Sequence, residues 1–107
     1  MNGRVASLRA LCGGPRDGAL LRVALANALI AQDDAGEAIV ELRRALEFDP
    51  DYSVAWKQLG KLLVDSGDAP AAVAAYRSGI AAAQKRGDKQ AEKEMTVFLR
   101  RVEKPSR

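Results

Sequence analysis

The feature that most constrains the fold of this chain is an internal period of 34 residues. The stretch from Ala19 to Tyr52 falls without a gap on the stretch from Ser53 to Arg86. Identical residues stand at six pairs of positions: Leu25/Leu59, Leu29/Leu63, Asp34/Asp68, Ala35/Ala69, Ala38/Ala72 and Arg43/Arg77. A repeat of this length indicates stacked supersecondary units. A generic four-helix bundle with chance periodicity is the alternative, but it does not explain why small residues recur at matching offsets.

Each unit is predicted to contain two helices joined by a short turn. Apolar residues recur at helical spacing on both sides of the segments AQDD and DSGD. Asp34 and Asp68 are favourable N-caps for the second helix of each unit, and Glu37 makes the first one close to a capping box. Pro70 lies in a first helical turn, where its missing N–H is harmless. Pro50 is expected to end the helix before it.

The residues between Trp56 and Tyr76 are expected to encode a tight crossing of two antiparallel helices. Gly60 supplies the small residue on the first helix of this pair, and Ala72 supplies one on the second. The large side chains of Trp56 and Tyr76 then fill the space beside the crossing. Gly79 is expected to leave room for the next helix. The spacing therefore predicts a helical hairpin that stacks on its neighbours.

These positions resemble the tetratricopeptide repeat, whose pattern is Trp-x2-Leu-Gly-x2-Tyr followed by small, aromatic and small residues and then Pro. The second unit matches the pattern at Trp56, Leu59, Gly60, Ala72, Tyr76 and Gly79. The first unit matches it at Leu25, Ala26, Ala38, Leu42, Ala45 and Pro50. Departures include Arg22 where Trp is usual and Gln84 where Pro is usual, so the last hairpin helix is expected to continue to Gly87. The resemblance implies an all-α fold, a short right-handed superhelix of about six helices.

The ends of the chain are expected to cover the apolar faces that two repeats leave open. The predicted single domain consists of a half-repeat helix over 4–12, repeats over 19–52 and 53–86, a capping helix over 88–102 and a tail over 103–107. Asp88 is expected to be the N-cap of the capping helix, which carries an apolar stripe of Ala91, Met95, Phe98 and Val102. The same stripe could instead dock on another protein.

The composition argues against catalysis and metal binding. The sequence has no His and a single Cys, Cys12, which is read as a small apolar residue at a helix end. A Cys nucleophile normally needs a neighbouring base, and the commonest metal ligand is absent. The segment GGPRDG lacks the Lys of a phosphate-binding loop. We therefore expect no enzyme activity, cofactor or metal. With no signal peptide or membrane span in the sequence, the expected location is the cytoplasm.

The resemblance implies that a partner binds in a concave groove lined by the first helix of each hairpin. The candidate positions are Leu20, Val23, Asn27, Ile30, Val54, Lys57, Lys61 and Val64. Lys57 and Lys61 are four residues apart, so both project from one helix face. The hypothesis is that Asn27, Lys57 and Lys61 contact an acidic or C-terminal carboxylate segment, while Val23 and Val64 contact its apolar side chains. The alternative is that both lysines are ordinary solvated residues.

Two other classes of function remain open at this point. Leu20, Val23 and Ile30 could form an apolar patch through which the chain associates with itself as a homodimer. Nucleic acid could bind Arg100, Arg101, Lys104 and Arg107, because the segment from Lys85 onward has a net charge of +4. Aromatic residues that would stack on bases are missing beside those charges, so a protein or peptide partner is favoured.

Overall fold

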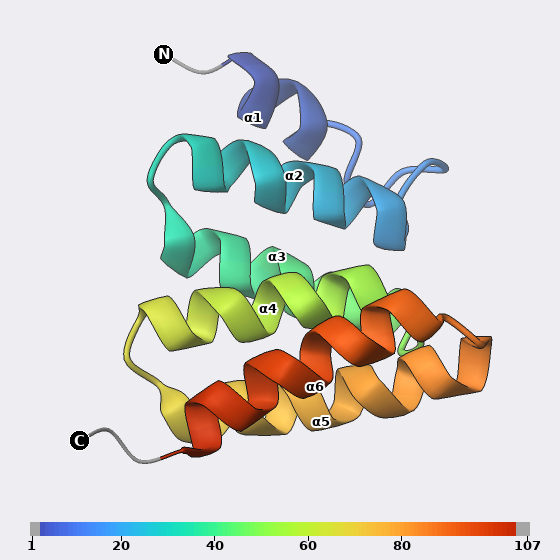
Figure 1. Cartoon of the computed structure of the whole chain (residues 1–107). Coiled ribbons are helices and arrows are strands. Elements are labelled where there is room, and N and C mark those ends of the chain that lie inside the picture. Colours follow the sequence, from blue (N-terminus) through green and yellow to red (C-terminus); the bar gives the residue numbers. More distant parts are fainter. Residues whose placement is uncertain (1–2, 105–107) are drawn as a thin grey trace. The chain divides into compact units, whose positions relative to one another are not determined.

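The computed structural model describes residues 3–104, and all the regular secondary structure in that range is α-helical (Figure 1). The chain forms two compact units that divide between Pro50 and Asp51. The first unit holds α1 (Gly3–Arg9), α2 (Ala19–Ala31) and α3 (Ala35–Phe48). The second unit holds α4 (Ser53–Asp65), α5 (Ala69–Arg86) and α6 (Lys89–Glu103). Arg107, one of the candidate nucleic-acid contacts, lies outside the described residues.

The same turn chemistry joins α2 to α3, α4 to α5 and α5 to α6. One Asp in each turn makes two hydrogen bonds. Its backbone N–H donates to a carbonyl near the end of the preceding helix, and its side chain accepts from a backbone N–H in the first turn of the following helix. The backbone bonds run from Asp34 to Leu29 (2.9 Å), from Asp68 to Leu63 (2.9 Å) and from Asp88 to Ala83 (2.8 Å). The three predicted N-caps, Asp34, Asp68 and Asp88, are therefore confirmed.

The residue before each of these aspartates has a positive φ. It is Gly67 with φ 85° in the second turn and Gly87 with φ 71° in the third. In the first turn it is Asp33, with φ 62°, a conformation that costs an L-residue more than glycine. As the sequence predicted, α5 continues past the usual Pro position and ends at Arg86.

The N-terminal helix is shorter than the predicted 4–12. Helix α1 ends at Arg9, and Leu11 and Cys12 lie in the turn that follows. Gly13, with φ 82°, and Gly14 end the helical run. No residue of α1 is buried, so apolar burial contributes little to its position.

A cluster of charges lies inside the first unit, and we call it the Glu41 cluster: Asp17, Glu41, Arg9, Arg22 and Arg44. The side chain of Glu41 is fully buried and accepts from Arg22 and Arg44, each at 2.8 Å, with Arg9 at 3.5 Å. Asp17 accepts from Arg22 at 2.7 and 2.9 Å, which lowers the pKa of Asp17 well below its usual range. Arg22, which stands where the repeat pattern usually has Trp, thus links the loop before α2 to α3.

Close backbone approach in the second unit depends on two glycines, as predicted. A Cβ placed on Gly60 would lie 2.6 Å from Cζ of Tyr76, and one placed on Gly79 would lie 2.6 Å from Cβ of Trp56 and against the sulfur of Met95. Both distances are far below van der Waals contact. Gly60 therefore allows α4 to cross α5, and Gly79 makes room for α6.

Gly60→Ala is expected to lower the free energy of unfolding by about 1–2 kcal/mol. Overpacking a tight site destabilises the fold by about 1–3 kcal/mol. The higher helix propensity of Ala offsets about 1 kcal/mol of that cost. Gly36→Ala is the matched control, because a Cβ there meets nothing within 4 Å, and it should be neutral or stabilising. Urea unfolding followed by circular dichroism at 222 nm would compare the two. Equal midpoints for both variants would contradict the crowding at Gly60.

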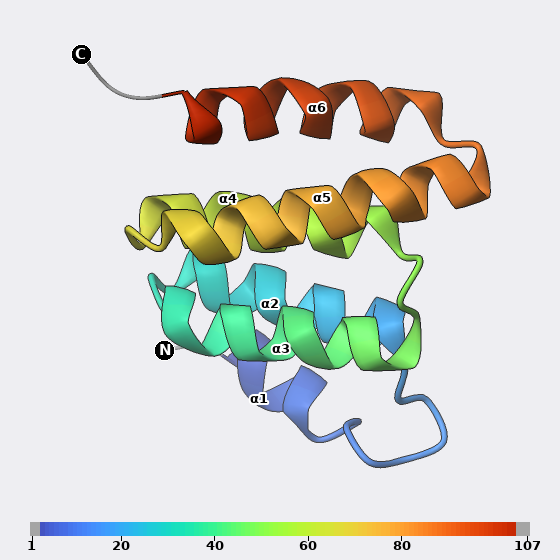
Figure 2. The same cartoon turned by 90° about the horizontal axis from the view of Figure 1, so that it is seen from below.

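Helix α6 packs on α5 through the apolar stripe that the sequence predicted. Met95 is fully buried and Ala91 is 6% exposed, in a cluster with Tyr76 and Ala83. The ring of Phe98 lies 5.8 Å from that of Tyr76. Figures 1 and 2 show α6 running alongside α5 over most of its length. Helix α6 makes fewer contacts with α4 than with α5.

Candidate functional site

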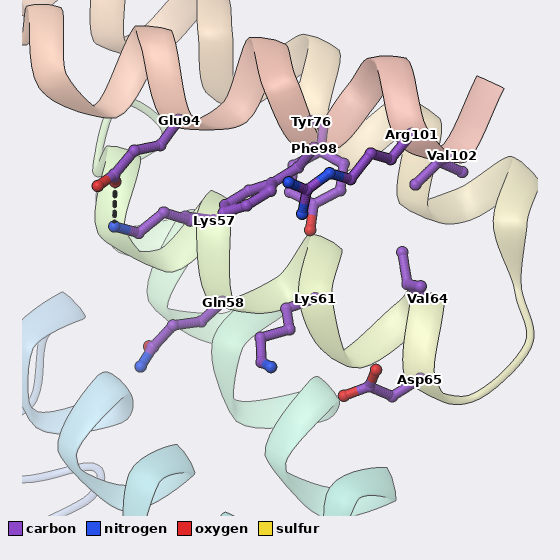
Figure 3. Close-up of a pocket in the computed structure, with 10 residues that line it drawn as sticks. All are labelled: Lys57, Gln58, Lys61, Val64, Asp65, Tyr76, Glu94, Phe98, Arg101 and Val102. Carbon is purple, nitrogen blue, oxygen red and sulfur yellow. Dashed lines mark hydrogen bonds and ion pairs between the residues drawn. The ribbon is translucent and has the colours of Figure 1, made fainter. Parts of the chain in front are cut away.

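A pocket of about 400 Å³ lies between α4 and α6 in the second unit, with α5 supplying its floor (Figure 3). Helix α4 contributes Lys57, Gln58, Lys61, Val64 and Asp65 to its lining. Helix α6 contributes Glu94, Phe98, Arg101 and Val102, and α5 contributes Tyr76. This concave surface belongs to the second unit alone, and we call it the α4–α6 pocket.

The floor of the α4–α6 pocket is aromatic and aliphatic. Tyr76 is only 3% exposed, and its ring packs against Phe98 while Val64 and Val102 flank the opening. Burial raises the pKa of Tyr76 above its ordinary value, and the negative charge of Asp65 adds to the shift. The phenol therefore stays protonated, and Figure 3 shows its oxygen pointing into the pocket, where it can donate a hydrogen bond.

The rim of the α4–α6 pocket is charged. Lys57 Nζ donates to Glu94 Oε1 at 2.6 Å, so these two side chains neutralise each other. Lys61 and Arg101 are exposed and take part in no ion pair among residues 3–104, with Asp65 the remaining anion of the lining. The pocket therefore combines an apolar floor with two available cations, a chemistry that suits an apolar side chain next to a carboxylate.

Three of the predicted binding residues meet in this pocket: Lys57, Lys61 and Val64. Val54 is 41% exposed on α4 but does not line it. On α2, in the first unit, Leu20 is 74% exposed, Ile30 is 37% exposed and Asn27 is also exposed. These residues have the exposure that the groove hypothesis requires.

The expected exposure of Val23 is wrong. Its side chain is only 6% exposed, because it lies one turn from Ala26 on a buried stripe of α2. Val23 cannot contact a partner's side chain as the structure stands. The proposed apolar patch of Leu20, Val23 and Ile30 also loses its middle member, which weakens the case for self-association through α2.

Sequence reasoning missed the half of the pocket that α6 supplies. The sequence predicts Phe98 and Val102 as parts of the capping stripe and Arg101 as part of a basic segment, and it predicts no role for Glu94. Asp88 gave the available signal, because it begins α6 with the same cap that begins a repeat helix. Because α6 packs beside the repeat, side chains at the edge of its apolar stripe, such as Phe98 and Val102, also line the pocket.

Residues 3–104 contain no group of three or more His, Cys, Asp or Glu side chains that could hold a metal ion. Within the same range, no helix is both long and apolar enough to cross a membrane.

Comparison with known proteins gives a consistent result. The tetratricopeptide repeat pattern matches residues 29–92. A TPR repeat-containing protein of Pseudomonas aeruginosa is 48% identical over 88 residues, which cover 82% of this chain and 84% of that protein.

Solved structures agree with this. The solution structure of a Bordetella parapertussis protein has a TM-score of 0.78 and 46% identity, and the match covers 95% of this chain and 89% of that one. A tetratricopeptide repeat domain protein of Salinibacter ruber has a TM-score of 0.77 and 29% identity, with 83% and 89% covered. The predicted all-α helical-repeat class is confirmed. Folds of this kind serve as protein–protein interaction modules, and the chain belongs to the tetratricopeptide repeat family.

Proposed function

We propose that this chain is a non-catalytic, cytoplasmic protein-interaction module that binds a short acidic segment of a partner protein in the α4–α6 pocket. The observation that carries the proposal is the pairing of an apolar floor with the available cations Lys61 and Arg101. An aliphatic or aromatic side chain of the partner would cover Phe98 and Val64, and a flanking carboxylate would lie between the two cations. Burial of the anchor supplies affinity, and the charges supply orientation and partner choice.

The two cations come from different helices, which gives the proposal a geometric basis. Lys61 is on α4 and Arg101 is on α6, on opposite sides of the opening in Figure 3. A carboxylate between them would be attracted from both sides, whereas a basic segment would be repelled. Leu20, Asn27 and Ile30, exposed on α2, and Val54 on α4 remain proposed contacts for a larger protein partner.

The structure changes which charge reversal is informative. The hypothesis drawn from the sequence would be tested by reversing the charges of Lys57 and Lys61 together. Because Lys57 already pairs with Glu94, Lys57→Glu would place two carboxylates face to face, and their repulsion would be mixed with any loss of contact to the ligand. Arg101 is the better target, since it carries no ion pair among the described residues and lies on the rim of the pocket.

The test uses the whole chain labelled with ¹⁵N and a terminally blocked peptide in which acidic residues flank a leucine. Its matched control peptide has Asn and Gln in place of Asp and Glu. We expect the acidic peptide to shift amide signals of α4 and α6, and Arg101→Glu to weaken binding by about tenfold or more. Arg100→Glu is the matched variant, because Arg100 lies with Lys93 and Val97 on the other side of α6. It should change affinity by less than about twofold.

Other results would favour the other classes of function. If Arg101→Glu and Arg100→Glu lose the same peptide affinity, the α4–α6 pocket is not the binding site. Binding of a single-stranded oligonucleotide, lost steeply with salt and without peptide binding, would indicate nucleic-acid recognition through Arg100, Arg101 and Lys104. A mass that rises with concentration in the same samples, with no peptide binding, would indicate self-association.

A further inference from the structure

The ion pair at the edge of the α4–α6 pocket is held from both sides. Lys57 donates to one oxygen of Glu94 at 2.6 Å, and Gln90, one helical turn earlier on α6, donates to the other oxygen at 3.0 Å. Both members of the pair line the pocket (Figure 3). The bond from Lys57, with a smaller contribution from Gln90, lowers the pKa of Glu94, so its carboxylate is charged at neutral pH.

The position of α6 does not depend on this pair. The side chains of Lys57 and Glu94 are 35% and 34% exposed, and ion pairs as exposed as these contribute about 0–1 kcal/mol. Met95 and Ala91, both buried, supply the packing of α6 against α5. The clearer consequence of the pair is local: it neutralises one of the three cations that line the pocket.

We infer that Glu94 is an internal competitor of the partner's carboxylate, occupying Lys57 until an acidic segment displaces it. The inference rests on the proposed function and adds a mode of regulation to the same pocket. On displacement, Lys57 joins Lys61 and Arg101 in facing the ligand, while Gln90 retains the Glu94 side chain on α6. The pocket therefore admits only a segment acidic enough to compete with Glu94, which sets a threshold for partner choice.

The decisive variant is Glu94→Gln, which keeps the shape of the side chain and removes its charge. We expect it to bind the acidic, leucine-containing peptide about two- to fivefold more tightly than the wild type, the range that loss of an exposed ion pair allows. The neutral control peptide should show no such gain. Glu92→Gln is the matched control on the same helix, because Glu92 lies outside the pocket and accepts a hydrogen bond from Gln84 at 2.9 Å.

The outcomes separate this inference from the proposed function. If the wild type and Glu94→Gln bind the acidic peptide equally, or if Glu92→Gln gains as much, the competitor role is overturned and the pocket proposal stands. A gain that extends to the neutral peptide would also overturn it, because displacement of Glu94 requires charge. If neither protein binds any peptide, both proposals are overturned. Binding by Glu94→Gln alone would be the strongest support.

Discussion

Arg22→Met is expected to lower the free energy of unfolding by about 3 kcal/mol, because it leaves a buried carboxylate without its closest buried partner. Arg22 is 12% exposed and bonds both Asp17 and the fully buried Glu41. Methionine approximates its length but cannot donate, so the buried carboxyl group of Glu41 would be left with only Arg9 and Arg44 as partners. Those two arginines are 41% and 48% exposed, so solvent screens their charges. Chemical denaturation followed by circular dichroism measures the loss.

Two further variants identify the cause of that loss. Arg44→Met removes another partner of Glu41 but an exposed one, and it should cost no more than about 1 kcal/mol. The double variant Arg22→Met/Glu41→Met should recover much of the stability, because it removes the uncompensated charge as well as its partner. Equal costs for Arg22→Met and Arg44→Met would show that burial of the pair does not matter.

The same variant should also change the response to acid. The pKa of Asp17 is lowered chiefly by the bonds from Arg22, so Asp17 contributes stability above its ordinary pKa near 4. That contribution is lost as the pH falls below about 4 towards the lowered value. In Arg22→Met the pKa of Asp17 returns towards normal, and the decline of stability with falling pH should be shallower.

Met95→Ala is expected to cost about 3 kcal/mol and to release α6. Met95 is fully buried against Tyr76 and Gly79, and truncation of a buried Met removes its packing and leaves a cavity. Trp56 packs against the same cluster and is the only tryptophan of the chain, so its fluorescence reports the change. Amide exchange should rise along α6 more than along α4.

Val97→Ala is the control for this experiment. Val97 lies on α6 but is 44% exposed, so its truncation should cost less than about 0.5 kcal/mol. If both truncations accelerate exchange in α6 equally, the helix is held by something other than the Met95 contact.

Much of the fold could be predicted because its signals are local. The aspartate caps need only the sequence around each turn, and all three predicted caps are present. Gly60 and Gly79 were predictable because only a residue without a side chain allows two helices so close together. The Glu41 cluster was not predictable, because its members come from α1, α2, α3 and the loop before α2. Nothing local marks Glu41 as buried, since a Glu on an exposed helix face has the same neighbours in sequence.

The candidate site was only partly predictable for a related reason. Lys57, Lys61 and Val64 follow from helical spacing on one helix, and they do meet in the pocket. The contributions of Phe98, Arg101 and Glu94 depend on how α6 lies against α4 and α5. The resemblance suggests Val23 as a groove residue, but it lies one turn from Ala26 on the stripe of α2 that tertiary packing buries. Spacing determines which residues share a face, and tertiary packing determines what that face meets.

The contact between Met95 and Gly79 also determines what oxidation of Met95 would do to the second unit. The Met95 sulfur fills the space in which a Cβ on Gly79 would lie. Peroxide can reach that sulfur only while α6 is displaced from α5. A sulfoxide oxygen would then need room that the closed packing lacks, and it would place a polar group in an apolar core. Oxidation of Met95 would thus keep α6 displaced from α5 until a methionine sulfoxide reductase reduces the sulfoxide.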